Sequence, residues 1–474
     1  MTGMNFQTGS NTESVNWADE RSRNVGEINI NKRFEKSIGF WDLMAIATGA
    51  IIGSGIMSLT GIGIGRTGRS IFVAFIIGGF ITLLARSPQI FLNSVARFRG
   101  GDYSMVGTLL GPRWTGTYSM ISLLTSVTLS MYALSFADYA MPFLPWITRK
   151  AIALGILTLL FAINVFGVNV FAKFQTLAVA LLIISLTIFT VIGLTRLDPN
   201  YFEKSSWMTG GFRGLWRAAI LMSYTCDGAQ GITSLSAEAK NPTKDIPRVM
   251  LLSTVGIAVF YGLLGVVAAG VLPVEQVANQ PLTVVAGTIL SKPLYYLFVI
   301  GGAWMALITT LNSSIASCTK PLMQACNDGW YPLSLARLHP KFRTPIILLG
   351  IYYVIGFVPI VLDFDIGVIS DITITVGSIT KFMIVLSLLR LPKVMPEAWK
   401  KSDFYISNTA LKAIGILDLC VIIFSGFMSS VELPLPLLAA NLAVVAFAFV
   451  FGRVRFNSGK VNVEVSYELP DSEK

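Results

Sequence analysis

Repeated apolar stretches, each about as long as a membrane-crossing helix, constrain the fold of this chain more than any other feature. A helix needs about 20 apolar residues to cross the hydrocarbon core of a bilayer. Twelve such stretches occur, at residues 40–60, 71–96, 115–143, 151–167, 173–195, 215–240, 247–272, 294–327, 344–362, 366–391, 408–428 and 432–452. Because 53% of the residues are hydrophobic and 13% charged, we expect an all-α membrane protein with 12 transmembrane helices.

The basic residues are distributed unevenly between the apolar stretches. If residues 1–37 are cytoplasmic, most of the 36 Lys and Arg residues fall on the cytoplasmic side. By the positive-inside rule, both termini are then cytoplasmic. We expect residues 1–37 and 456–474 to be cytoplasmic tails, the first disordered, around a twelve-helix domain at 38–455. The net charge of +10 then needs no nucleic acid, and the lipid bilayer of the plasma membrane, or a bacterial inner membrane, is the expected surroundings.

Residue types that carry catalysis or bind metals are scarce. The chain has one histidine, His339, and four cysteines without the paired spacing of a zinc site or a disulfide scaffold. We therefore expect no enzyme activity, no metal and no cofactor.

The first and sixth apolar stretches interrupt their own helical pattern near the middle. The first stretch contains Gly49, Gly53 and Gly55, and the sixth stretch contains Asp227 followed by Gly228. Glycine weakens a helix, and an aspartate at membrane depth needs a cavity or a partner. Glycines that only permit close helix packing are the alternative. Paired interruptions in two halves of a chain favour a transporter site instead.

Such a site suits a zwitterion. Amides near Ser54 and Gly55, at the start of the second half-helix, would face a carboxylate with the positive end of a helix dipole. Carbonyl groups near Ile51 and Cys226, which end the first half-helices, would accept hydrogen bonds from an ammonium group.

Several motifs occur in a specific order along the chain. They are Gly49–Ile56, Gly100–Tyr103, Glu238–Arg248, Asp328–Pro332 and Leu338–Pro345. Over residues 38–395 the chain resembles the amino acid, polyamine and organocation (APC) transporter superfamily. The resemblance implies a LeuT-type 5+5 inverted repeat plus two C-terminal helices. The first repeat would cover about 38–195, the second about 213–391, and the added helices about 408–452.

The resemblance also implies roles for individual residues. Ile51, Ser54 and Gly55 would contact the α-amino and α-carboxylate groups of the substrate. Tyr224 falls where the family often has an aromatic lid, and Asp227 and Gly228 fall in its unwound stretch.

Two positions depart from the family pattern. Gln230 stands where several exchangers and polyamine carriers have a glutamate, which argues against holding a polycation that way. Leu182 stands where many proton-coupled or sodium-independent members have a lysine. Asp227 could take over proton coupling or neutralise an extra substrate cation, or it could cap the second half-helix. Both readings stay open.

Other polar residues in the apolar stretches have less specific interpretations. Arg86, beside Pro88, is interpreted chiefly as part of an interfacial kink, with a cytosolic gate as the alternative. Lys381 could lie in a vestibule. Hydroxyl and amide groups at helical spacing could bind sodium but more often hydrogen-bond between helices. They belong to Asn312, Ser313, Ser314 and Ser317.

We therefore expect a secondary active transporter that moves a zwitterionic amino acid by alternating access, as a monomer or homodimer. A precursor/product exchanger of an amino acid against an amine is one alternative, and a cationic amino acid or polyamine carrier is another. A non-transporting amino acid sensor is the alternative from a different class.

Overall fold

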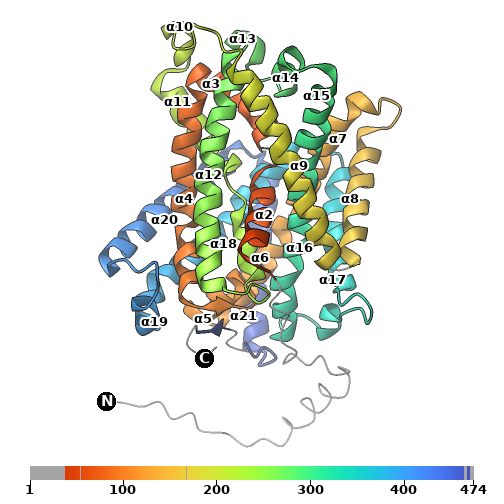
Figure 1. Cartoon of the computed structure of the whole chain (residues 1–474). Helices are drawn as coiled ribbons and strands as arrows, with labels where there is room; N and C mark the ends of the chain where they lie inside the picture. The colour runs from red at the N-terminus through yellow and green to blue at the C-terminus, as the bar shows by residue number, and fades with distance from the viewer. Residues whose placement is uncertain (1–37, 54, 167, 464–466, 470–474) are drawn as a thin grey trace, which may run out of the picture.

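The chain is helical almost throughout in a computed structural model, which describes residues 38–53, 55–166, 168–463 and 467–469 (Figure 1). The α-helices are α2 (Phe40–Ile51), α3 (Thr60–Thr67), α4 (Ile71–Val95), α5 (Asp102–Leu109), α6 (Arg113–Leu124), α7 (Thr128–Ala140), α8 (Arg149–Val165), α9 (Val168–Leu194), α10 (Lys204–Trp207), α11 (Gly211–Thr225), α12 (Pro242–Gly270), α13 (Val274–Val277), α14 (Thr283–Ile289), α15 (Lys292–Leu297), α16 (Met305–Asn327), α17 (Ile346–Val361), α18 (Ile366–Val394), α19 (Pro396–Lys400), α20 (Asn408–Glu432) and α21 (Leu435–Asn457).

Short irregular helices and one strand pair complete the described part of the chain. The π-helical segments are η1 (Gly55–Leu59) and η6 (Phe298–Trp304). The 3₁₀ segments are η2 (Gly68–Ser70), η3 (Thr125–Val127), η4 (Met141–Phe143), η5 (Ala229–Leu235) and η7 (Leu333–Ala336). Strands β1 (Arg97–Phe98) and β2 (Tyr467–Glu468) pair antiparallel, which joins the segment before α5 to the C-terminal segment.

The prediction of an all-α membrane protein is confirmed. Among the described residues, 8 segments are long and apolar enough to cross a membrane: Thr60–Val95, Arg113–Phe143, Gln175–Leu194, Pro242–Gly270, Lys292–Asn327, Ile366–Val394, Asn408–Phe427 and Leu435–Asn457. The helices Phe40–Ile51 and Ile346–Val361 are apolar but shorter. Large apolar side chains on the outer helices are exposed, as lipid contact requires. The count of twelve spans stays a prediction.

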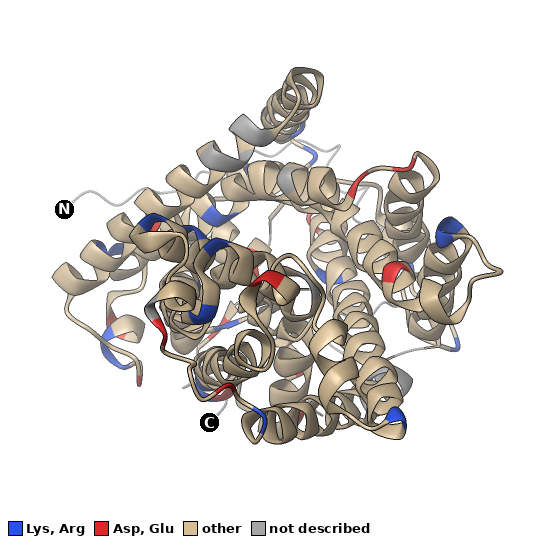
Figure 2. Cartoon of the chain, turned by 90° about the horizontal axis from the view of Figure 1, so that it is seen from above, with Lys and Arg blue, Asp and Glu red and all other residues tan. Residues whose placement is uncertain are grey.

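Charge is kept away from the outer walls of the bundle. Seen from above in Figure 2, most of the ribbon is neither acidic nor basic, and coloured residues lie mainly at helix ends and in loops. The two ends of the helix bundle carry different short elements. Helices α5 and α19 lie at the end where β1 and β2 pair, and α10, α13 and α14 lie at the opposite end (Figure 1). We call the first of these the strand end.

Two groups of helices surround the broken segments. Helix α4 packs along α11 and α12, and α2 lies against α12, α16 and η5. Their buried apolar side chains form one continuous core. Helices α7, α8, α16 and α17 build a second core. The interrupted segments α2–η1 and α11–η5 therefore lie in the protein interior, where irregular backbone at membrane depth is tolerated.

Candidate functional site

Two helix breaks lie at the heart of the molecule, where the sequence predicted them. Helix α2 ends at Ile51, Ile52 is extended with φ −77° and ψ 94°, and the π segment η1 begins at Gly55. Helix α11 ends at Thr225, and the 3₁₀ segment η5 begins at Ala229. Ser54, predicted to contact substrate, lies outside the described residues.

Glycine is required where these two breaks touch. A Cβ atom on Gly228 would lie 2.5 Å from the carbonyl oxygen of Ala50 and 2.8 Å from the Cα atom of Ile51. A Cβ atom on Gly55 would lie 3.0 Å from the Cα atom of Thr225. At Gly228 the two segments thus approach too closely for a side chain, and at Gly55 a side chain would require Thr225 to shift by a few tenths of an ångström. These glycines allow the two broken segments to cross in close contact.

Hydroxyl groups satisfy the carbonyl oxygens that the α2 break leaves without helical partners. Thr310 Oγ1 donates to the carbonyl oxygens of Gly49 at 3.1 Å and Ile52 at 3.2 Å, and Thr309 Oγ1 donates to that of Gly49 at 3.2 Å. Tyr261 Oη lies 3.4 Å from the Ile51 carbonyl oxygen. These buried bonds hold the break open against α16 and α12.

A cavity of about 400 Å³ begins at the two breaks and extends toward α5 at the strand end. Its walls come from α2, the strand-end half of α4, η5, α16 and α18, together with the helices from α6 to α7. Of the predicted substrate contacts, Ile51, Gly55, Tyr224, Asp227 and Gly228 line this cavity. Of the other two, Ser54 lies outside the described residues, and Cys226 is fully buried and its side chain does not line the cavity.

On the other side of the breaks the helices are closely packed. The Asn279 amide donates to the Gly61 carbonyl oxygen at 2.8 Å, and the Arg69 guanidinium pairs with Asp198 at 2.5 Å. The hydrogen bond from Arg69 holds the pKa of Asp198 below its usual value. In this structure the cavity thus extends toward the strand end, and these contacts lie on the opposite side of the breaks.

A buried ion pair between α4 and the second break dominates the charge of the cavity. Arg86 Nε donates to Asp227 Oδ1 at 2.6 Å, and a second guanidinium nitrogen of Arg86 bonds Asp227 Oδ2. The Arg86 side chain is 5% exposed and that of Asp227 19%. The interpretation of Arg86 as part of an interfacial kink is therefore wrong. Its guanidinium reaches the unwound segment and neutralises the carboxylate there.

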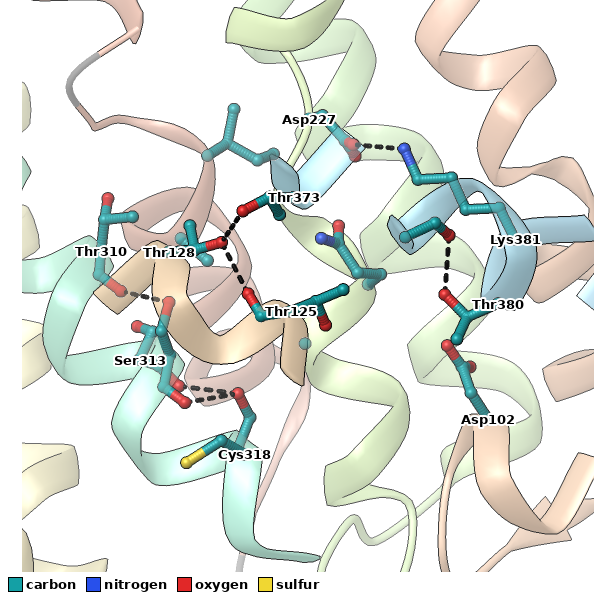
Figure 3. A pocket seen from close by; sticks show the side chains of 18 of the residues that line it. Asp102, Thr125, Thr128, Asp227, Thr310, Ser313, Cys318, Thr373, Thr380 and Lys381 are labelled. Atoms are coloured by element: carbon teal, nitrogen blue, oxygen red, sulfur yellow. Dashed lines mark hydrogen bonds and ion pairs between the residues drawn. The ribbon is translucent and has the colours of Figure 1, made fainter. Parts of the chain in front are cut away.

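A second cation approaches the same carboxylate from α18. Lys381 Nζ lies 4.0 Å from Asp227 Oδ2, and its side chain is 46% exposed, toward the cavity. Figure 3 shows the Asp227 and Lys381 side chains pointing toward each other, with Asp102 below Thr380 on the same side of the view as Lys381. Two cations therefore share one carboxylate at the inner end of the cavity.

A polar chain connects this pair with Asp102, the first residue of α5. Arg86 Nη1 donates to Gln89 Oε1 at 3.0 Å, and Gln89 Nε2 donates to Asp102 Oδ2 at 2.7 Å. Thr233 Oγ1 lies 3.3 Å from Asp102 Oδ1. Burial raises the pKa of Asp102 although these hydrogen bonds oppose the shift. The sequence analysis singled out the motif Gly100–Tyr103 but gave its aspartate no role in the cavity.

The residues considered for a sodium site are engaged in hydrogen bonds between and within helices. Asn312 Oδ1 accepts from Asn164 Nδ2 at 2.7 Å, and Ser313 Oγ accepts from Gln175 Nε2 at 2.9 Å. Ser314 and Ser317 donate to backbone carbonyl oxygens of their own helix. This arrangement favours the structural interpretation of the four residues.

Comparisons with known proteins agree with this geometry. The sequence profile of the amino acid permease family matches residues 38–451. The branched-chain amino acid permease BcaP of Bacillus subtilis is 24% identical over 67% of this chain and 72% of its own length. The serine/threonine exchanger SteT of Bacillus subtilis is 25% identical, over 67% and 74%. Cationic amino acid transporter 1 of Arabidopsis thaliana is 23% identical, over 67% and 56%.

The matched profile spans the broken helices, the cavity and most of the C-terminal helices. Such proteins are transporters and not enzymes, they embed in a membrane through many helices, and the APC superfamily includes them. This chain belongs to the amino acid permease family.

Proposed function

We propose that this permease carries a zwitterionic amino acid across the plasma membrane by secondary active transport. The observation that carries the proposal is the meeting of two broken helices at the inner end of a cavity of about 400 Å³. At a helix break, backbone amides and carbonyl groups that would be hydrogen-bonded within an intact helix are free to bind a substrate. A cavity of this size suits a small molecule.

The substrate's α-carboxylate would bind the amides near Ser54 and Gly55, at the start of η1. Its ammonium group would bind carbonyl oxygens that end α2 and α11, near Ile51 and Cys226. Asp227 and Gly228 form the opposite wall, and Tyr224 covers the substrate. This pose uses the positive and negative helix ends for the two charges of a zwitterion.

Alternating access would follow from movement of α2 to α4 and α11 to α12 against the other repeat helices. The packing of α4 along both α11 and α12 supports a unit that moves as one body. The present structure would be the inward-facing state, with the strand end in the cytoplasm and both termini there. We extend the proposal to twelve spans, the LeuT-type repeats at about 38–195 and 213–391, and a monomer or homodimer.

Two observations weigh between the alternatives. The name of BcaP refers to branched-chain amino acids and that of SteT to serine and threonine, which supports a zwitterion. The Arg86 guanidinium already pairs with the Asp227 carboxylate through two hydrogen bonds, so a substrate cation would have to displace it to bind there. That disfavours the cationic amino acid or polyamine carrier. It also favours a role of Asp227 in recognition over a role in proton carriage.

Uptake into proteoliposomes tests the proposal. We would measure labelled leucine, serine, threonine, arginine and putrescine, with and without unlabelled substrate inside. We expect uptake of at least one of the first three. Uptake of arginine or putrescine alone would support the cationic alternative, and binding of an amino acid without flux would support a sensor. No binding and no flux of any of the five would refute an amino acid or amine substrate.

A further inference from the structure

An acidic residue outside the cavity wall, Asp418 on α20, has surroundings that differ from those of every acid discussed above. Its side chain is 0% exposed, and in the described part of the chain neither carboxyl oxygen has a hydrogen-bond partner. The neighbouring positions Ile416 and Leu417 are 57% and 55% exposed, so they form the outer face of α20. Asp418 therefore faces the protein interior from a peripheral helix.

The packing of α20 on α18 fixes the level of Asp418 in the membrane. A Cβ atom on Gly415 would lie 2.7 Å from Leu389, and one on Gly426 would lie 2.8 Å from Ser378. These two contacts run in opposite directions along the helices. Interpolation between them places Asp418 level with Leu386, about one and a half helical turns from Lys381.

Two cations act on Asp418. Arg86 is the one charged residue of α4, and the charges of Arg86 and Lys381 both act electrostatically on Asp418. On α18, Arg390 donates to the Leu110 carbonyl oxygen, and Asp371 and Lys393 lie more than two turns from Lys381. The other charged residues near the cations are Asp227, which lies beside both, and Asp102, which acts electrostatically on Arg86 and accepts a hydrogen bond from Gln89. Lys412 and Glu432 lie farther along α20.

The partners of the two cations leave Asp418 without a direct contact. Arg86 directs Nε and one terminal nitrogen to Asp227 and the other terminal nitrogen to Gln89. Lys381 turns toward Asp227 across 4.0 Å. An ionised carboxylate without hydrogen bonds is strongly disfavoured in this interior, whereas the neutral acid is disfavoured far less.

We propose that Asp418 is the proton-binding site that couples this permease to a proton gradient. The inference rests on the proposed transport function. In the present state Asp418 holds the proton on a carboxyl oxygen, and two cations face the single negative charge of Asp227. A substrate carboxylate in the cavity is then favoured, because it meets a positive excess.

Release follows when a cation turns to Asp418. If Lys381 or Arg86 leaves Asp227 and pairs with Asp418, the O–H bond breaks, the proton passes to water, and both electrons of that bond stay on the carboxylate. Two cations then face two carboxylates, and the excess that attracted the substrate carboxylate is gone. Substrate and proton are thus released in the same state of the cluster.

Infrared difference spectroscopy of the purified full chain tests the proton directly, without any substrate. At pH 7 we expect wild type minus Asp418→Asn to show the carbonyl stretch of a protonated carboxyl group. Asp138→Asn, which alters an exposed acid paired with Arg149, serves as the control and should show none. In Lys381→Met, which keeps Asp418, the band should persist to higher pH because a nearby cation is lost. Absence of the band, or a Lys381→Met titration like that of wild type, overturns the proposal.

Transport provides the second readout. With an inward proton gradient, accumulation of the best substrate among the five labelled compounds should fall about tenfold or more in Asp418→Asn, while exchange at equal pH changes less than about twofold. Equal accumulation by wild type and variant refutes the coupling role, as does wild-type exchange that ignores the gradient. If wild type exchanges none of the five compounds, the proposed function fails while the infrared band still decides the protonation of Asp418.

Discussion

Replacing one member of the Arg86–Asp227 pair should lower the free energy of unfolding nearly as much as replacing both members. Two unit charges about 4 Å apart attract by about 4 kcal/mol at an effective dielectric constant of about 20. The 5% exposure of Arg86 and 19% exposure of Asp227 limit solvent screening, but Lys381 and cavity water reduce the net term. We therefore expect a coupling energy of about 2–3 kcal/mol, and about 3 kcal/mol lost in each single variant.

A double-mutant cycle measures this coupling. Arg86→Met, Asp227→Asn and the double variant would be unfolded by denaturant titration in detergent, with tryptophan fluorescence as the signal. The exposed pair Arg149–Asp138, with a 2.5 Å contact, provides the control cycle, for which we expect below about 1 kcal/mol. If the losses in the two single variants sum to the loss in the double variant within about 0.5 kcal/mol, the argument that each charge is left buried and unpaired without the other is refuted.

Two further predictions concern the break and the closed end. Gly228→Ala places a methyl group 2.5 Å from the Ala50 carbonyl oxygen, so we expect substrate exchange to fall at least about tenfold. In the control Gly231→Ala the methyl group meets only Ser317 Oγ, at 3.9 Å, so exchange should change less than about threefold. Equal effects of the two variants in the uptake assay would contradict the argument that the two breaks cross at Gly228. Because Arg69 lowers the folded-state pKa of Asp198, the stability that this pair contributes is fully present above the usual aspartate pKa of about 3.9 and is lost as pH falls through the lowered value. Thermal unfolding of wild type and Asp198→Asn should therefore differ at pH 6 and converge in strong acid, and a difference that grows toward acid would contradict this sign.

Local features of the sequence predicted the breaks well. Helix interruption depends on glycine content within a few residues, so Gly53, Gly55 and Gly228 were sufficient to locate both breaks. The length of each apolar stretch likewise predicted helices, because membrane thickness sets that length. Tyr224 and Asp227 were found to line the cavity because they neighbour a break.

Long-range partners could not be predicted in the same way. Arg86 and Asp227 lie 141 residues apart in sequence, and only the packing of α4 on α11 brings them together. Arg86 next to Pro88 has the local signature of a kink, so sequence alone favoured the wrong interpretation. Asp418 was overlooked for a related reason. Its significance depends on which face of α20 is buried, and a uniformly apolar helix does not reveal that face.

The same helix breaks that prepare a binding site also explain why cations gather beside it. Helices α2 and α11 both end at the cavity, so both present the negative ends of their dipoles there, and Asp227 adds a full negative charge. Arg86 and Lys381 compensate this potential when no substrate is bound. A substrate that binds these helix ends through its ammonium group brings its carboxylate toward the two cations, which keeps both of them at the cavity and away from Asp418. Under this argument, substrate binding at the breaks and retention of the proton on Asp418 favour each other through one electrostatic balance.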